Sequence, residues 1–320
     1  MMLIGMMMLF ARSSVFLTSP DSLSIGITVD LLVTAPLVYY LLIRKTSIPK
    51  TTIVVFLIAG MVIGSYILPA QNQYYLDLFK TWVFPLVELS IVSFVIFKVF
   101  QAIKGYKTNH NRSFDFYTTL KNTCHEILPK SIVTPFVTEI AVFYYGFINW
   151  KKRTLQENEF SYHKESGTAS LLFAILFIIL IETVAVHILL VRWSELAAWI
   201  LTILSLYTVI QLFGFLKSLS KRPISIENNK LFLRYGIMNE TTIDLASIDS
   251  IEISSKDIEL NEETRKLSFL GELEGHNVII RLRKENTLVG LYGRKRKYMN
   301  LALHVDQKNE FKDRIDNALT

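Results

Sequence analysis

The segment from Leu171 to Trp193 reads LLFAILFIILIETVAVHILLVRW and decides the class of the protein. An α-helix needs about 20 consecutive apolar residues to cross the hydrocarbon core of a bilayer, and this segment is long enough to do so. It nevertheless contains Glu182 and His187. Ionisable side chains are costly at membrane depth and usually face a partner, a cavity or water. The segment therefore predicts a membrane-spanning helix whose two polar residues need an explanation.

The composition of the whole chain agrees with a membrane protein that carries a soluble part. Of its 320 residues 51% are hydrophobic, and the mean hydropathy is +0.35. The first 220 residues contain 17 Lys and Arg against 12 Asp and Glu, whereas the remainder contains 17 against 16. The positive excess therefore surrounds the apolar segments, where it indicates membrane topology rather than nucleic-acid binding. A single cysteine, Cys124, excludes an intrachain disulfide.

Five segments have the length and the apolar character of a membrane span. They are Leu23–Ile43, Thr51–Pro69, Trp82–Phe100, Thr168–Val191 and Leu196–Leu216. A sixth segment, Ser131–Trp150, also qualifies by length and has Glu139 near its middle. Basic residues flank this sixth segment on both sides, and basic loops stay in the cytoplasm. The charges therefore favour a segment that enters and leaves on one side.

The residues just before this sixth segment support the same interpretation. FDFYTTLKNTCHEIL, residues 114–128, has apolar side chains at helical spacing and predicts an amphipathic helix on the inner membrane surface. We therefore favour an α-helical transmembrane bundle of five spans, with an amphipathic or re-entrant insert near residues 114–150. Six spans are the alternative.

The pattern changes from long apolar runs to alternation after Arg222-Pro223. Two strands are predicted in ISIENNKLFLRYG, joined by Asn228-Asn229, because asparagine tolerates the positive φ of a tight turn. Further strands are predicted at TTIDL, SIDSIEIS, HNVIIRLR, NTLVGLYG and YMNLALHV. A final helix follows in DQKNEFKDRIDNAL, with Asp306 as its predicted cap. Residues 1–219 thus form a helical domain, and residues 220–320 form a small, mainly-β barrel or sandwich.

The strand order, the closing helix and the position after a span make this C-terminal part resemble a bacterial pleckstrin-homology-like (PH-like) domain. The resemblance implies a cytoplasmic domain that contacts lipid, peptide or its own chain, without a catalytic motif. The most basic run is GRKRK, residues 293–297. Its candidates for contact with anionic headgroups are Arg294, Lys295, Arg296 and Lys297. The alternative interpretation is that these charged side chains lie in water at the rim of a β-hairpin.

The membrane half resembles an uncharacterised family of bacterial integral membrane proteins. The residues that carry this resemblance are ENEFSYHKESG (157–167), Glu182, His187, Trp193 and AAWILTILSLY (197–207). The resemblance implies a multi-pass protein of the inner, cytoplasmic membrane with its C-terminal domain in the cytoplasm. It assigns no activity and no cofactor.

Polar residues at membrane depth are the candidates for chemistry: Asp30, Glu88, Glu139, Glu182 and His187. On an ideal helix Glu182 and His187 diverge by about 140° around the axis, so the two are a poor metal site by themselves. His187 lies near the end of its span, where solvation at the interface explains it. All five also have a simple interpretation, in which each pairs locally with a hydroxyl or N–H group.

Three classes of function remain open. The first is a scaffold or sensor that presents the PH-like domain at the inner leaflet. The second is a membrane-embedded enzyme acting on an apolar or lipid substrate, with Glu182, Glu139, His125 and His163 as its polar groups; a metal there would need His125 and His163, which lie far apart in the sequence. The third is a small transporter. No nucleotide, serine-hydrolase or zincin motif is present in the sequence.

Overall fold

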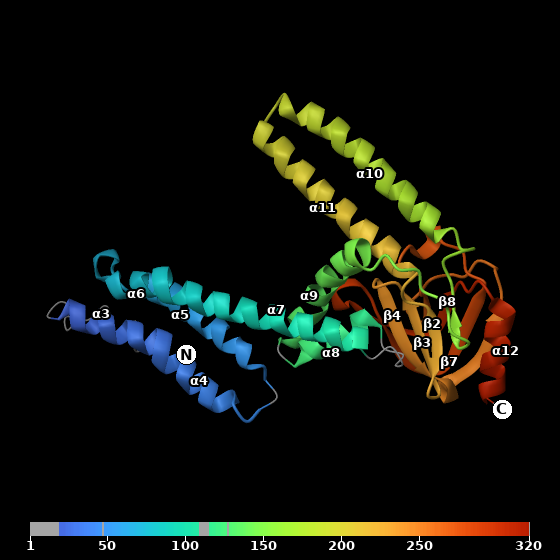
Figure 1. Cartoon of the computed structure of the whole chain (residues 1–320), viewed down its shortest axis with the longest axis horizontal. Helices are drawn as coiled ribbons and strands as arrows, with labels where there is room; N and C mark the ends of the chain where they lie inside the picture. The colour runs from blue at the N-terminus through green and yellow to red at the C-terminus, as the bar shows by residue number, and fades with distance from the viewer. Residues whose placement is uncertain (1–18, 47, 109–114, 127, 320) are drawn as a thin grey trace. The chain divides into compact units, whose positions relative to one another are not determined.

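A computed structural model describes residues 19–46, 48–108, 115–126 and 128–319. The chain divides into two compact units, Met1–His110 with Thr118–Val133, and Asn111–Tyr117 with Thr134–Thr320. Figure 1 shows the order of the helices and strands along the chain. The predicted boundary at residue 220 marks the change from helix to strand, whereas the second compact unit contains both the last helices and the sheet.

The first unit is helical. Its helices are α3 (Pro20–Val29), η1 (Asp30–Thr34), α4 (Ala35–Ile43), η2 (Lys50–Thr52), α5 (Ile53–Ile67), η3 (Ala70–Asn72), α6 (Tyr74–Leu78), η4 (Phe79–Val83) and α7 (Phe84–Thr108). Three continuous helical stretches result that are long and apolar enough to cross a membrane, Pro20–Ile43, Lys50–Ile67 and Tyr74–Gln101. The predicted helices at these positions are confirmed.

Close helix packing in this unit depends on a glycine. A Cβ on Gly60 would lie 2.6 Å from the carbonyl oxygen of Leu31, so only glycine allows α5 to approach η1 so closely. The buried core around this contact consists of Ile27, Leu31, Leu32, Met61, Leu68 and Leu76.

Two turns of π-helix in this unit, η1 and η4, end just before Pro36 and Pro85. Proline lacks an N–H and clashes with the preceding turn, and a widened turn accommodates both effects. The helix before Pro85 is therefore widened into a π-helical turn, η4.

Four further helices follow, and the last three are apolar. α8 (Phe116–His125) comes first, then α9 (Lys130–Phe143), which continues into η5 (Tyr144–Ile148), and then α10 (Thr168–Val191) and α11 (Glu195–Leu219). The stretches Lys130–Ile148, Thr168–Val191 and Glu195–Leu219 bring the candidate spans in the described chain to six. Of the 18 most apolar consecutive residues in Lys130–Ile148, 44% are buried inside the protein. The corresponding shares are 0% in Thr168–Val191 and 11% in Glu195–Leu219. Lys130–Ile148, the segment for which the sequence left the number of spans open, is therefore more covered by protein than the two helices that follow it.

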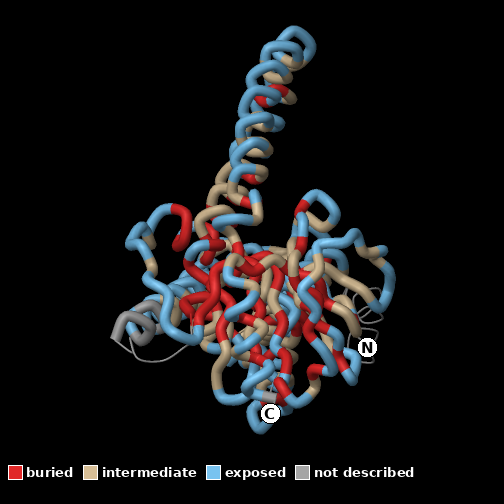
Figure 2. Tube along the Cα trace, turned by 90° about the vertical axis from the view of Figure 1, so that its right-hand side faces the viewer, coloured by how far each residue is buried: buried red, intermediate tan, exposed pale blue. Residues whose placement is uncertain are grey.

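α10 and α11 form an antiparallel hairpin that begins and ends beside the sheet (Figure 1). Ser194 caps α11, because its hydroxyl accepts a hydrogen bond from the backbone N–H of Ala197. Figure 2, in which the hairpin rises at the top, shows most of its length exposed or half-buried. Large apolar side chains such as Phe173, Ile181 and Leu204 are among the exposed ones. An apolar surface of this kind suits a helix pair surrounded by lipid.

The rest of the second unit is a sheet of eight strands and a closing helix. The strands are β1 (Glu159–Phe160), β2 (Ile224–Glu227), β3 (Lys230–Tyr235), β4 (Asn239–Asp244), β5 (Ile248–Ile253), β6 (Thr264–Lys266), β7 (Val278–Val289) and β8 (Lys295–Leu303), and the helix is α12 (Lys308–Leu319). The strand order is β1-β2-β3-β4-β7-β8-β6, and β5 pairs with β7.

The described strands form an open sheet and do not close into a barrel, which was one of the two predicted architectures. The register of β7 against β8 shifts between Arg281 and Asn286. Before the shift β7 pairs with β5, and after it Val289 pairs with Glu240 of β4. β7 therefore changes its neighbour along its length, and among the described strands β1, β5 and β6 each have one paired neighbour and form edges.

The hairpin turn at Asn228 and Asn229 is confirmed, with φ angles of 48° and 61°. The strands predicted at HNVIIRLR and NTLVGLYG are one continuous strand, β7, and the short strands β1 and β6 were not predicted. Asp306 lies two residues before α12 begins, and its carboxylate accepts hydrogen bonds from the backbone of Lys164 and Glu165. This aspartate therefore ties the connector after η5 to the β domain.

The connector, residues 151–167, is an integral part of the β domain. Its Glu159 and Phe160 form β1 and pair with β2. Phe160 packs edge-on against Phe311 of α12, with 5.2 Å between the ring centroids. Phe311 and Ile315 are fully buried under the sheet, as their spacing in the sequence predicts. The connector between η5 and α10 therefore lies on the same side of a membrane as the C-terminal domain.

Candidate functional site

The β domain is fastened to the end of α11 by a buried ion network. Arg222 follows α11 by three residues and is 0% exposed. Its Nε and Nη2 lie 2.9 Å from carboxylate oxygens of Asp115 and Glu240, and its Nη1 donates to the carbonyl of Gly236. The guanidinium also lies 4.6 Å from the ring centroid of Tyr117. A buried charge of this kind is tolerated only when it is paired and hydrogen-bonded, as here.

The electrostatics of this network keep Arg222 and Tyr117 each in one protonation state. Burial by itself lowers the pKa of Arg222, but Asp115 and Glu240 outweigh it and raise the pKa above its usual value. Burial, with Glu240 adding to it, raises the pKa of Tyr117 to about 12. The arginine is therefore charged and the phenol neutral at every physiological pH.

A second buried contact fastens the start of α10. Glu274 is 3% exposed, and its carboxylate accepts hydrogen bonds from the hydroxyls of Thr168, Tyr235 and Ser268. Thr168 is the first residue of α10. Both ends of the α10–α11 hairpin are therefore fixed to the β domain by buried polar groups.

Glu139 of α9 lies at the centre of a polar cluster, the Glu139 cluster, formed with Tyr207, Gln211 and Tyr292. Oε2 of Glu139 accepts hydrogen bonds from the Tyr207 hydroxyl at 2.8 Å and from Gln211 Nε2 at 2.7 Å. Oε1 accepts one from the Tyr292 hydroxyl at 3.2 Å. Gln211 Nε2 also reaches the Tyr207 oxygen at 2.7 Å. α9, α11 and the β7–β8 connection thus meet at one carboxylate.

The β7–β8 connection, residues 290–294, is shaped for this contact. Tyr292 and Gly293 both have positive φ, 55° and 85°. A Cβ on Gly293 would lie 3.4 Å from the Thr134 side chain of α9. A bulky residue such as tyrosine rarely adopts a positive φ, and surrounding contacts must hold it there. The hydrogen bond from Tyr292 to Glu139 is such a contact.

The predicted basic run begins in the same connection and continues into β8, and its four basic residues differ in their surroundings. Lys297 Nζ pairs with Glu285 at 2.6 Å, and Arg296 is half-buried beside Asn239. Burial, together with Arg294 and Arg265, lowers the pKa of Arg296. Arg294 and Lys295 are exposed, and their side chains make no hydrogen bond or ion pair with a residue that the structure describes.

The other predicted intramembrane groups do not join the Glu139 cluster. Asp30 is half-buried, Glu88 and Glu182 are exposed, and none of their carboxylates bonds to another described residue. His187 Nδ1 lies 2.7 Å from the Thr202 hydroxyl across the α10–α11 hairpin, and its ring meets that of Trp199 edge-on. For Glu139 and His187 the simple interpretation, local pairing with hydroxyl groups, is therefore the observed one.

The two candidate histidines outside the spans belong to different compact units, His125 to the first and His163 to the second. Burial lowers the pKa of both; Lys121 and Lys130 add to the effect at His125, and Asp306 opposes it at His163. Within the described part of the chain, no three His, Cys, Asp or Glu side chains come together as a metal site requires. The convergence of Glu139, Glu182 and a histidine that an enzyme site would need is not seen there.

Several important residues were not singled out from the sequence. Tyr207 and Gln211 lie on the apolar helix α11, and Tyr292 lies within a segment predicted as a strand, NTLVGLYG. In the sequence, Arg222 marked only the place where long apolar runs give way to alternating residues. An arginine directly after a span and before a strand was the one available signal, because a charge at that position must be either solvated or paired.

Comparisons with known proteins add no relative: no protein-family description, curated protein or solved structure matches the chain.

Proposed function

We propose that this chain is a multi-pass protein of a bacterial inner membrane whose C-terminal PH-like domain acts as a binding module, a scaffold or sensor, at the inner leaflet. The observation that carries the proposal is the buried network of Arg222 with Asp115 and Glu240. A domain fixed to the ends of two apolar helices stays at one height and in one orientation at the membrane surface.

The exposed cations support a contact with anionic lipid. Arg294 ends the connection that docks on α9, a candidate span, and Lys295 is the next residue, the first of β8. A cation held close to an anionic leaflet contributes about 1 kcal/mol. Two such residues give a modest preference, which suits a domain that the helices already hold at the membrane.

The PH-like assignment is supported by the antiparallel strands β2, β3 and β4 and by the closing helix α12. The open sheet leaves β6 as an edge, and edge strands are surfaces to which peptides can add. A peptide partner is therefore the alternative ligand of the same module.

The placement of α9 supports five spans with an insert. α9 contacts the β7–β8 connection at Thr134 and Glu139. Tyr144 of η5, which continues α9, stacks on Phe116, the first residue of α8. A helix covered in this way by the β domain suits the membrane surface. Exposed apolar residues lie on α9 and η5: Ile132, Phe143, Phe147 and Ile148.

The test uses the full-length protein exposed to an equal mixture of phosphatidylcholine and phosphatidylglycerol, with retained lipid identified by native mass spectrometry. We expect phosphatidylglycerol to be enriched, and R294E/K295E to remove the enrichment. The matched control is K256E/K284E, which reverses two other exposed lysines of the β domain. Equal effects of both double variants, or no enrichment in the native protein, would refute the headgroup contact.

A further inference from the structure

We infer that the Glu139 cluster binds a primary ammonium group carried by a lipid headgroup, such as that of phosphatidylethanolamine. The inference rests on the proposed placement at the membrane and goes beyond it, because it assigns a ligand of positive charge to a site separate from the basic residues.

The first observation is a carboxylate without a counter-ion. Glu139 accepts hydrogen bonds from two phenols and one amide, and all three donors are neutral. No Lys, Arg or His of the described chain forms an ion pair with it. A charge partly removed from water is stabilised most by an opposite charge, so this carboxylate is suited to a cation.

The second observation is an unused acceptor beside that carboxylate. Gln211 is 6% exposed, and its Nε2 is engaged by Glu139 and Tyr207. Its Oε1 is buried and has no partner in the described part of the structure. A buried acceptor without a donor is costly, and most such atoms in proteins are satisfied by protein, water or ligand. The Oε1 atom of Gln211 therefore lacks a hydrogen-bond donor, and a ligand with an N–H group can supply one.

The chemistry of these atoms selects among cations. A primary ammonium carries three N–H donors, which match acceptors of the carboxylate, phenol and amide types. A quaternary ammonium has no N–H to donate. Divalent metal ions prefer several oxygen ligands with more than one carboxylate, whereas Glu139 is the one carboxylate of the cluster. A primary ammonium is therefore the best match.

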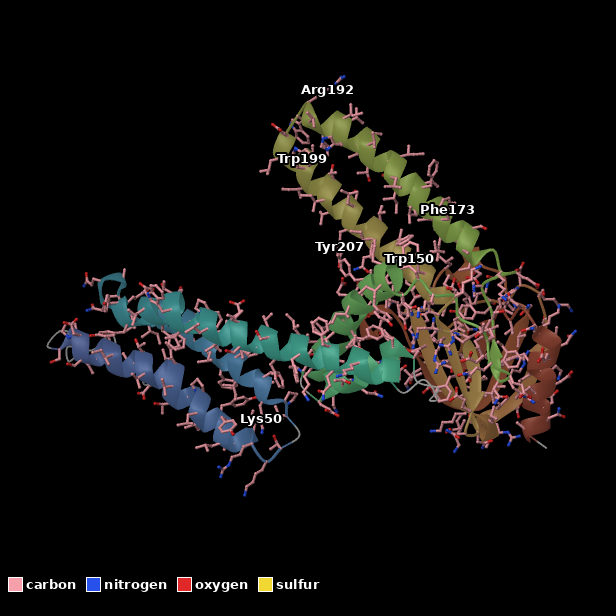
Figure 3. The ribbon with its side chains drawn as sticks, viewed as in Figure 1. Lys50, Trp150, Phe173, Arg192, Trp199 and Tyr207 are labelled. Atoms are coloured by element: carbon pink, nitrogen blue, oxygen red, sulfur yellow. The ribbon has the colours of Figure 1, made fainter. Side chains whose placement is uncertain are left out.

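The surroundings of the site indicate that the ammonium belongs to a lipid. The Tyr207 and Tyr292 side chains are 44% and 46% exposed, so the Glu139 cluster is open on one side. Exposed apolar residues lie one helical turn away, Phe143 on α9 and Ile203 and Leu204 on α11. Figure 3 labels Tyr207 on the part of α11 that meets α9 and Trp150 near the same junction. A ligand that reaches this site passes along an apolar surface.

The test exposes full-length protein to an equal mixture of phosphatidylethanolamine and phosphatidylcholine and measures the ratio retained. Both lipids carry the phosphate, so the ratio reports the ammonium alone. A charge-assisted hydrogen bond contributes enough for about a tenfold preference. We expect such a preference in the native protein, less than twofold in Glu139→Gln, and a retained preference in Glu139→Asp, which keeps the charge.

The control is Glu182→Gln, which removes the same charge from an exposed position of α10 and should leave the ratio unchanged. Equal retention of the two lipids by the native protein, or equal loss in the Gln and Asp variants of Glu139, would overturn the inference. So would a rise in melting temperature with free ethanolamine as large as that with the lipid, because the ligand would then be a soluble amine. R294E/K295E tests the proposed function separately, since it should not change this ratio.

Discussion

α9 and α10 are both long apolar helices with a glutamate near the middle, and they differ in nearly every contact. Glu139 of α9 accepts hydrogen bonds from three side chains. Glu182 of α10 is exposed and bonds to no other described side chain. Hydropathy alone does not separate the two helices, because both meet the criterion for a membrane span. The difference lies in what packs against them: the β domain covers α9, whereas α10 is fastened to that domain at its first residue.

The largest effect should come from breaking the network that joins α11 to the β domain. Removing one partner of a buried ion pair leaves an uncompensated charge and costs about 3–5 kcal/mol. Arg222→Met should therefore lower the free energy of unfolding by that amount, measured by chemical denaturation of the purified full-length protein. Arg314→Met, which removes an exposed arginine paired with Glu157, is the control and should change stability by less than about 1 kcal/mol. Similar losses in both variants would contradict the account.

The next effect tests the contact of α9 with α11 directly. A Cβ on Gly214 would lie 2.7 Å from the carbonyl oxygen of Val142, so Gly214→Ala must push the two helices apart. We expect a loss of about 1–3 kcal/mol, seen as a lower melting temperature. Gly26→Ala is the matched control, since nothing lies within 4 Å of the added atom. A helical alanine there should stabilise by up to about 1 kcal/mol.

A smaller effect separates the two glutamates. Glu139→Gln removes charge-assisted hydrogen bonds and should cost about 1–2 kcal/mol. Glu182→Gln should be neutral or slightly stabilising, because a charge in an apolar span is unfavourable. Melting temperatures of both variants in the same lipid mixture provide the comparison. If Glu182→Gln proves the more damaging change, Glu182 has a partner outside the described residues and the contrast between the helices fails.

The smallest effect concerns His163, in the connector between the two helices. Burial lowers its pKa in the folded state below the usual value of 6.5, and Asp306 only partly opposes this. The unfolded chain therefore binds a proton first as the pH falls. This contribution to stability is complete above about pH 6.5 and is lost below it. The melting temperature should fall less between pH 7 and pH 5 in His163→Gln than in the native protein, and an unchanged pH profile would argue against this role.

Local features of the fold were predictable from the sequence, and contacts between distant residues were not. Asn228 and Asn229 specify their turn because few other residues accept positive φ. β6 has three residues and depends on its parallel pairing with β8, for which no local pattern exists. β7 continues through Lys284, Glu285 and Asn286, a polar stretch at which two separate strands were predicted to meet.

The same limit applies to the candidate site. Glu139 could be singled out because a carboxylate in an apolar segment needs a partner. Its partners could not be named, since Tyr207 and Tyr292 lie 68 and 153 positions further along the chain. Tyrosine at the edge of a span also has a simpler interpretation as part of the aromatic belt, so its identity carried no signal.

The most direct test of the contrast between α9 and α10 is the sidedness of the chain before and after α9. Reporter fusions at Asn109 and Asn158, which precede and follow α9 in the sequence, report this in intact cells. If α9 rests on the β domain without crossing the membrane, as we propose, both reporters lie in the cytoplasm. Reporters on opposite sides would show that α9 spans the bilayer as α10 does, and would contradict the account.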